Sequence, residues 1–182
     1  PTGFCIFPAG WNPVRMQWIS NELIRELLRV LNHAFLERQA RVDLDLAEDL
    51  PLLHADRGLL QQALFNLFNN AVEAIPVKGK ILVSTRMESV KTGDLEQLEG
   101  SGTVFVINIE DNGEGISREN LEHIFEPFYT TRMGYGTGLG LSITYGIIQK
   151  LGGRIRVESE LGKGTRFIIY LPMRTIPTRA MP

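Results

Sequence analysis

The chain has 182 residues, enough for one sizeable domain with a hydrophobic core. It is 43% hydrophobic and 22% charged, and its net charge of −2 gives no basic surplus that would indicate a nucleic-acid partner. The single cysteine, Cys5, excludes an internal disulfide framework and any multi-cysteine metal site, which suits a reducing compartment. No apolar run approaches the roughly 18 residues of a membrane span. We expect a cytoplasmic domain, whether or not its parent protein is anchored in a membrane.

The first 15 residues contain three prolines and two glycines, a composition typical of a linker. The chain starts at Pro1 rather than at a methionine, so we expect a piece of a longer protein. From Trp18 to about Arg41, apolar residues recur at the i, i+3, i+4 spacing of one amphipathic helix. Residues 42–46 alternate apolar and acidic side chains, which predicts a short half-buried strand.

A second helix is predicted from about Asp56 to Ile75, followed by strands at 80–86, 103–110, 154–158 and 166–171. The polar stretch 88–102 between the first two of these strands indicates a long hairpin loop. Apolar spacing from Leu139 to Leu151 predicts a further helix. Helices interspersed with hairpin-like strands favour an α/β two-layer sandwich, in which a mixed β-sheet has its helices on one face.

Asn66, Asn70 and Glu73 lie at i, i+4 and i+7 of the second helix, so their side chains share one face. An amide oxygen is a neutral, hard ligand that suits Mg²⁺, an ion that prefers oxygen and keeps waters and substrate phosphates in its shell. The alternative is that these are solvated surface amides, which is the interpretation we give to Asn69.

The strand predicted at 103–110 runs into Asp111, Asn112 and Gly113, a common turn sequence. Besides a plain turn, this segment permits a base-binding function. An ionised carboxylate only accepts hydrogen bonds. Asp111 would therefore match the exocyclic amine of adenine and mismatch the carbonyl of guanine, and Gly113 and Gly115 would let the backbone pass close under the ring.

A glycine-rich loop at residues 130–141 has glycine at every second position from Gly134 to Gly140. Without Cβ atoms its amide N–H groups can turn toward a phosphate, and the N-terminus of the following helix adds a favourable dipole. A flexible glycine linker is the alternative. The aromatic segment 125–129 just before the loop would anchor a mobile lid, and Arg132 within the lid could contact γ-phosphate oxygens.

Taken in order, the segments 66–71, 111–115, 125–128 and 134–141 resemble the N, G1, F and G2 boxes of sensor histidine kinases, and the run 151–167 is similar to the end of the same family. The asparagine box most resembles the nitrogen-regulatory and PAS-linked branch. The resemblance covers roughly residues 16–172. Four boxes in the right order are far more specific than any one of them.

The resemblance implies the Bergerat ATP-binding fold of the GHKL superfamily, with ATP and Mg²⁺ bound by residues 16–173. It implies that Asn70 ligates Mg²⁺ with assistance from Asn66, and that Arg132 and Asn66 serve the transfer step. Thr165 would support Asp111, and Ala74, Ile116 and Leu141 would line the base pocket. The residues expected to bind the nucleotide are Asn66, Asn70, Glu73, Ala74, Asp111, Gly113, Gly115, Ile116, Thr131, Gly134, Gly136, Thr137, Gly138, Leu139, Gly140, Leu141 and Thr165.

The family's phosphoacceptor motif, a histidine followed by an acidic residue, is missing: His33, His54 and His123 precede Ala34, Ala55 and Ile124. We therefore expect the dimerisation and phosphoacceptor domain to lie upstream, with 1–15 as its linker remnant and 174–182 as a C-terminal tail. The expected partners are that domain and the receiver domain of a response regulator, with no nucleic acid. The parent would be a homodimer. Alone, this chain should bind ATP without phosphorylating itself.

Two other functions remain open. In ATP hydrolases and serine kinases of the same fold, a glutamate stands four residues before the metal-binding asparagine and can activate water or a hydroxyl. Here that position is Asn66, which is no base, and this argues against hydrolysis. The other is a degenerate binding module, whose nucleotide only fixes the conformation of a lid for a partner.

Overall fold

A computed structural model describes residues 16–19, 21–48, 50, 53–89, 102–131 and 136–173. In chain order the elements are β1 (Met16–Ile19), α1 (Glu22–Val30), α2 (Asn32–Glu37), β2 (Arg41–Leu46), β3 (Leu53–Asp56), α3 (Arg57–Ala74), β4 (Lys80–Ser89), β5 (Thr103–Asp111), α4 (Arg118–Leu121), α5 (Gly140–Lys150), β6 (Arg154–Glu160) and β7 (Gly164–Pro172). None of the helices in these ranges is both long enough and apolar enough to cross a bilayer.

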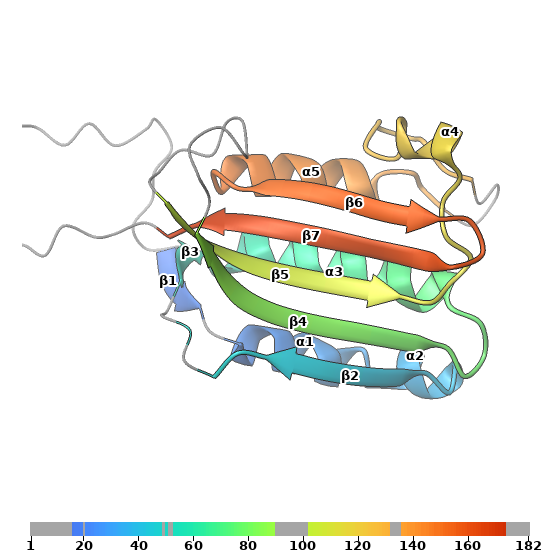
Figure 1. Cartoon of the computed structure of the whole chain (residues 1–182), viewed down its shortest axis with the longest axis horizontal. Helices are drawn as coiled ribbons and strands as arrows, with labels where there is room; N and C mark the ends of the chain where they lie inside the picture. The colour runs from blue at the N-terminus through green and yellow to red at the C-terminus, as the bar shows by residue number, and fades with distance from the viewer. Residues whose placement is uncertain are drawn as a thin grey trace, which may run out of the picture.

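Five strands form one mixed sheet in the order β2-β4-β5-β7-β6, and β1 pairs with β3 in a separate antiparallel ribbon. Within the large sheet β2 is parallel to β4, and the chain returns between them through α3. The other neighbours are antiparallel. Figure 1 shows α1, α3 and α5 behind one face of this sheet, so the predicted two-layer α/β sandwich is confirmed.

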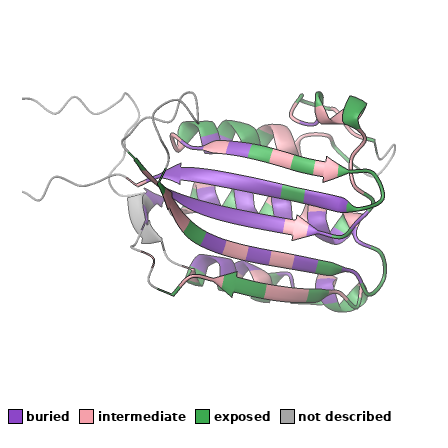
Figure 2. Ribbon diagram, viewed as in Figure 1, coloured by how far each residue is buried: buried purple, intermediate pink, exposed green. Residues whose placement is uncertain are grey.

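The core lies between the sheet and the helices that cover it. The apolar stripe predicted on the second helix is buried, from Leu60 at 1% exposure through Leu64 and Leu67 to Ile75 at 2%. It packs against inward side chains of the central strands such as Ile107. Figure 2 shows β5 and β7 buried along most of their length, which agrees with their place in the middle of the sheet.

The single helix predicted from Trp18 to Arg41 is wrong. Trp18 lies in β1, opposite His54 of β3, and the helical segment is divided at Leu31 into α1 and α2. The residues after the break, Asn32 and His33, are weak helix formers. The ribbon of β1 and β3 was missed, as was α4, because short elements carry little periodicity.

The later strands were predicted correctly, although each is longer than expected. β4 extends to Ser89, β6 to Glu160, and β7 begins at Gly164 rather than Arg166. Glu88 and Ser89 therefore belong to a strand instead of the loop predicted at 88–102, and 90–101 lie outside the described residues. The antiparallel pairing of Ser89 with Thr103 agrees with a hairpin.

Candidate functional site

The candidate site is arranged along one face of α3. Asn66, Asn70 and Ala74 are spaced by four residues, so they line the same face over about 12 Å of helix. Asp56 caps the beginning of α3, where its Oδ1 accepts a hydrogen bond from the N–H of Leu59 at 3.1 Å. This cap and the buried apolar stripe fix the rotation of α3 against the sheet.

At the C-terminal end of α3, the turn that follows β5 packs against the helix. The N–H of Glu114 donates to the carbonyl of Ala74 at 3.1 Å. Asp111, the last residue of β5, is only 5% exposed, and its Oδ1 accepts a hydrogen bond from Gly113 N–H at 2.8 Å. A buried carboxylate is thus held beside the end of α3. We call this region the base end.

Glycines are required where backbones meet at the base end. A Cβ on Gly113 would lie 2.5 Å from the carbonyl oxygen of Ala74, and one on Gly115 would lie 2.1 Å from that of Glu160. Gly164 is the tightest, since its Cβ would lie 1.9 Å from the carbonyl oxygen of Asp111. These contacts show that backbone packing, before any ligand is considered, excludes a side chain at these positions.

Ser159 connects the segments of the base end and was missed by the sequence analysis. Its hydroxyl accepts from the N–H of Ile116 at 2.8 Å, donates to the carbonyl of Gly164 at 2.8 Å, and lies 2.9 Å from the hydroxyl of Thr165. Thr165, 6% exposed, pairs with Asp111 across β5 and β7. The available signal was the segment 159–165, which combines polar residues with two glycines. A segment of that kind also fits a plain turn.

Halfway along α3, Asn66 faces the beginning of α5. Its Nδ2 donates to the carbonyl of Gly140 at 3.2 Å and to Oγ1 of Thr144 at 3.4 Å. Thr144 is fully buried and donates in turn to Gly140 at 2.8 Å. The N-cap residue of α5, Leu139, makes no side-chain cap hydrogen bond, and the helix begins at Gly140, the residue whose carbonyl Asn66 contacts. We call this region the phosphate end.

Asn70 lies on α3 between the two ends, one turn from Asn66 and one from Ala74. Its Nδ2 is buried and has no hydrogen-bond partner. An unsatisfied buried donor is unfavourable by about 1–3 kcal/mol, so such a group indicates a missing acceptor. Within the described residues, Asn70 is one of two side chains that have a buried polar atom without a hydrogen-bond partner.

The aromatic segment before the glycine loop contacts the loop's described end. The N–H of Phe128 donates to the carbonyl of Gly138 at 2.9 Å, and a Cβ on Gly138 would lie 2.4 Å from the Phe128 backbone. Phe128 has a φ of 67° and a side chain that is 75% exposed. Phe125, in contrast, packs against the core. The segment therefore holds the loop mainly through its backbone.

The other residues predicted to bind the nucleotide differ in how exposed they are. Ile116 and Leu141 are half-buried and pack against the core, whereas Glu73 is exposed on α3. Thr131, Gly136 and Thr137 are exposed. Arg132 and Gly134 lie outside the described residues, so their predicted roles stay predictions. In the described part of the chain, no group of three His, Cys, Asp or Glu side chains is placed to hold a metal ion.

Residues 55–175 match the model of a family described as histidine kinase-, DNA gyrase B- and HSP90-like ATPases, which is more than half of the chain. The chain belongs to this family. The similar proteins within this family include sensor histidine kinases. The chain is therefore an ATP-binding domain of the histidine kinase type.

Three relatives illustrate this. Sensor kinase CckA of Brucella abortus (strain 2308) is 41% identical over 150 residues, which are 80% of this chain and 16% of CckA. The catalytic domain of histidine kinase ThkA superposes with a TM-score of 0.71 and 29% identity, covering 87% of this chain and 95% of that domain. Full-length ShkA, solved in complex with AMPPNP, has a TM-score of 0.71 and 26% identity over 91% of this chain and 33% of ShkA. The chain thus spans about a sixth of CckA and a third of ShkA.

Proposed function

We propose that this chain binds Mg·ATP between the base end and the phosphate end and donates the γ-phosphoryl group to a histidine on a separate phosphoacceptor domain. The observation that carries the proposal is the buried Nδ2 atom of Asn70, which has no hydrogen-bond partner, on a residue of α3 between the buried carboxylate of Asp111 and the uncapped beginning of α5. A nucleotide running along α3 would bring an acceptor to this amide.

At the base end, Asp111 would accept a hydrogen bond from the exocyclic amine of adenine. Guanine presents a carbonyl there, so an acceptor-only carboxylate selects ATP over GTP. Thr165, paired with Asp111 across the strands, would support the carboxylate, and Ala74, Ile116 and Leu141 would contact the ring. The packed glycines keep this end in place before the nucleotide arrives.

At the phosphate end and just beside it on α3, the amide oxygens of Asn66 and Asn70 fit Mg²⁺, because such oxygens are neutral, hard ligands and the ion completes its shell with waters and phosphates. Asn70 would hold the ion. Asn66 uses its Nδ2 on Gly140, which leaves Oδ1 as the atom it would turn to the ion. When bound, Mg²⁺ neutralises developing charge on the triphosphate.

The amides at the beginning of α5 would contact the phosphates, together with the loop that includes Gly136, Thr137 and Gly138. From the sequence alone, Gly134, Thr131 and Arg132 would complete this contact, with Arg132 meeting γ-phosphate oxygens. Phosphoryl transfer requires mainly positioning and charge neutralisation. The chain would supply both, while the base that deprotonates the acceptor would belong to the other domain.

The side chain of Asn66 argues against ATP hydrolysis. A hydrolase of this fold needs a general base at this position, and an amide whose nitrogen donates to Gly140 and Thr144 cannot take up a proton from water. Asn66→Glu should therefore retain ATP binding without creating an efficient hydrolase, because the glutamate would also lose the contacts to α5.

For partners, ThkA has been solved in complex with response regulator protein TrrA, and that kinase resembles this chain with a TM-score of 0.68. By analogy, the parent of this chain would be a homodimer that phosphorylates a receiver domain. Residues 16–173 would be the ATP-binding unit, 1–15 a linker to the phosphoacceptor domain, and 174–182 a tail.

The deciding experiment is calorimetric titration with ATP in the presence and absence of Mg²⁺, with GTP as the competing base. Asn70→Ala should lower Mg·ATP affinity about 10- to 100-fold. Asn69→Ala, which alters the neighbouring amide on another face of α3, is the matched control and should leave affinity unchanged.

A second step mixes the chain with a cognate phosphoacceptor domain and labelled ATP. Phosphohistidine should form on the added domain and depend on Asn70. Tight binding without phosphohistidine would favour a degenerate binding module, and rapid hydrolysis by the unmodified chain would overturn the proposal.

A further inference from the structure

The face of the sheet that is turned away from α3 and α5 carries a hollow centred on Asn108. Asn108 and Asp111 are three residues apart on β5, so they point to opposite faces, and the hollow is separate from the nucleotide site. Asn108 pairs with Ser84 of β4 on one side and with Ile168 of β7 on the other. The hollow has a volume of about 310 Å³, at the small end of ligand cavities.

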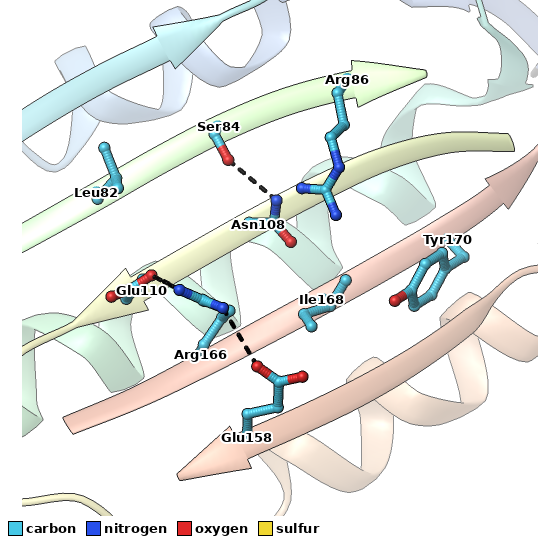
Figure 3. A pocket seen from close by; sticks show the side chains of 9 residues that line it. All are labelled: Leu82, Ser84, Arg86, Asn108, Glu110, Glu158, Arg166, Ile168 and Tyr170. Carbon is cyan, nitrogen blue, oxygen red and sulfur yellow. Dashed lines mark hydrogen bonds and ion pairs between the residues drawn. The ribbon is translucent and has the colours of Figure 1, made fainter. Parts of the chain in front are cut away.

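Asn108 is 93% buried, and its two amide atoms differ in how they are satisfied. Nδ2 donates to Oγ of Ser84 at 3.0 Å, whereas Oδ1 is buried without a partner. Figure 3 shows the oxygen directed toward the middle of the hollow and the nitrogen toward Ser84. A buried acceptor of this kind calls for a donor from outside the protein.

The charged side chains around the hollow are paired with one another. Arg166 donates to Glu110 at 2.6 Å and to Glu158 at 3.3 Å, and Arg86 bonds Glu88 at 2.5 Å. The lining therefore presents no excess of either sign. A neutral ligand would leave all of these pairs intact, so the lining suits a neutral compound.

Apolar surface completes the lining. Leu82 is half-buried on β4, and Ile168 and Tyr170 of β7 are 5% and 7% exposed. The Tyr170 ring lies 5.8 Å from the guanidinium of Arg156, which holds the ring on this face. An apolar wall beside one buried acceptor fits a flat molecule that carries a single donor.

We propose that this hollow is a second ligand site, which takes a small, neutral, flat compound whose N–H donates to Oδ1 of Asn108. The apolar body of the ligand lies against Leu82, Ile168 and Tyr170. The site does not depend on the nucleotide site, because the two face opposite sides of the sheet.

Indole and benzofuran test the proposal, since they have nearly the same shape and only indole has an N–H donor. In titrations of the full chain followed by backbone and side-chain amide NMR, indole should shift the signals of residues 84, 108 and 168. It should bind at least about fivefold more tightly than benzofuran, the worth of one neutral hydrogen bond. Saturating ATP should not displace it.

Two variants make the test specific. Asn108→Leu removes the acceptor and should abolish the preference for indole. Leu82→Trp fills the hollow from its half-buried rim and should prevent binding of both compounds. Both variants should retain wild-type ATP affinity, which shows that they fold. Equal affinity for indole and benzofuran, shifts at other residues, or an unchanged preference in Asn108→Leu would overturn the proposal, as would a chain that binds neither compound.

Discussion

The two ends of the proposed nucleotide site differ in how complete they are. At the base end, the turn after β5, the end of α3 and the turn before β7 are joined by backbone hydrogen bonds and by Ser159. The carboxylate of Asp111 is held there by Gly113. Between the two ends, Asn70 keeps a buried donor without a partner, and the beginning of α5 lacks a side-chain cap.

This difference suggests that the two parts of the site respond differently to the nucleotide. The base end, which is already assembled, would bind the base without reorganising, whereas the buried Nδ2 of Asn70 would gain an acceptor only when the nucleotide and its metal bind. The unliganded protein would thus be less stable than it could be, which is common where function requires a strained or unsatisfied group.

The largest expected effect is at the base end. Gly164→Ala places a Cβ 1.9 Å from the carbonyl oxygen of Asp111, at a φ of 114° that L-residues rarely adopt. We expect a loss of about 3 kcal/mol or more in the free energy of unfolding, measured by urea denaturation.

Gly162→Ala is the matched control for that substitution. Gly162 also has a positive φ, 79°, but nothing lies within 4 Å of its Cβ position. Its loss should be about 1 kcal/mol, which isolates backbone strain from the steric clash. Similar losses in the two variants would show that the clash relaxes and that the base end is not rigid.

Asp111→Asn tests base reading without removing the contact to Gly113, because the amide oxygen can still accept that N–H. ATP affinity should fall about 10- to 100-fold, while the selectivity for ATP over GTP shrinks. Glu110→Gln, one residue earlier on β5 and on the opposite face, should leave both unchanged. If Glu110→Gln weakened ATP binding as much as Asp111→Asn does, the loss would come from a less stable β5. Recognition of the base would then have to come from other residues.

Much of the fold was predictable because its elements are long and periodic. The stripe from Leu60 to Ile75 predicted α3, and the mainly apolar segment 166–171, which ends against Pro172, predicted β7 within two residues at its start. The helix break at Leu31 was not predictable, because the apolar spacing continues through it. The β1–β3 ribbon depends on pairing between residues 34 to 40 positions apart in the chain, from Ile19 with Leu53 to Met16 with Asp56, which local pattern does not encode.

The candidate site was predictable where spacing alone decides. Positions 66 and 70 fall on one helical face from the 3.6-residue period, and Asp111 follows from the end of a strand. The role of Ser159 and the unpartnered Nδ2 of Asn70 could not be predicted, because both depend on what the tertiary structure brings near them. Nor does the sequence distinguish Gly164 from an ordinary turn glycine, because the residue that it packs against, Asp111, is 53 positions away in the chain.

The next largest expected effect distinguishes Asn70 from Asn66 on α3. Asn70→Leu removes an unsatisfied buried donor, so the unliganded chain should be unchanged or up to about 1 kcal/mol more stable, while Mg·ATP no longer raises its melting temperature. Asn66→Leu removes the hydrogen bonds to Gly140 and Thr144, and should lower stability by about 1–2 kcal/mol. Equal destabilisation by both variants would mean that Asn70 is satisfied in solution, and the proposed incompleteness of the site would fail.

The smallest effect concerns the aromatic segment that holds the glycine loop. His123 Nδ1 lies 2.8 Å from Oε1 of Glu126, and its ring lies 5.6 Å from that of Tyr129. The hydrogen bond and the negative charge of Glu126 raise the pKa of His123 above its usual 6.5. Because the folded-state pKa is the higher one, the pair stabilises the fold fully below pH 6.5, and this contribution is lost as the pH rises through the folded-state pKa.

NMR titration of the His123 ring should show this raised pKa, and Glu126→Gln should return it toward 6.5 because the acceptor's charge is gone. Both side chains are exposed, so the change in stability between pH 5.5 and 8.5 should be small, and ATP affinity should not follow it. The segment meets the loop through the Phe128 backbone and Gly138 rather than through His123. A parallel change in ATP affinity that disappears in Glu126→Gln would instead show that the phosphate end is coupled to this ion pair, and that its incompleteness is regulated by protonation.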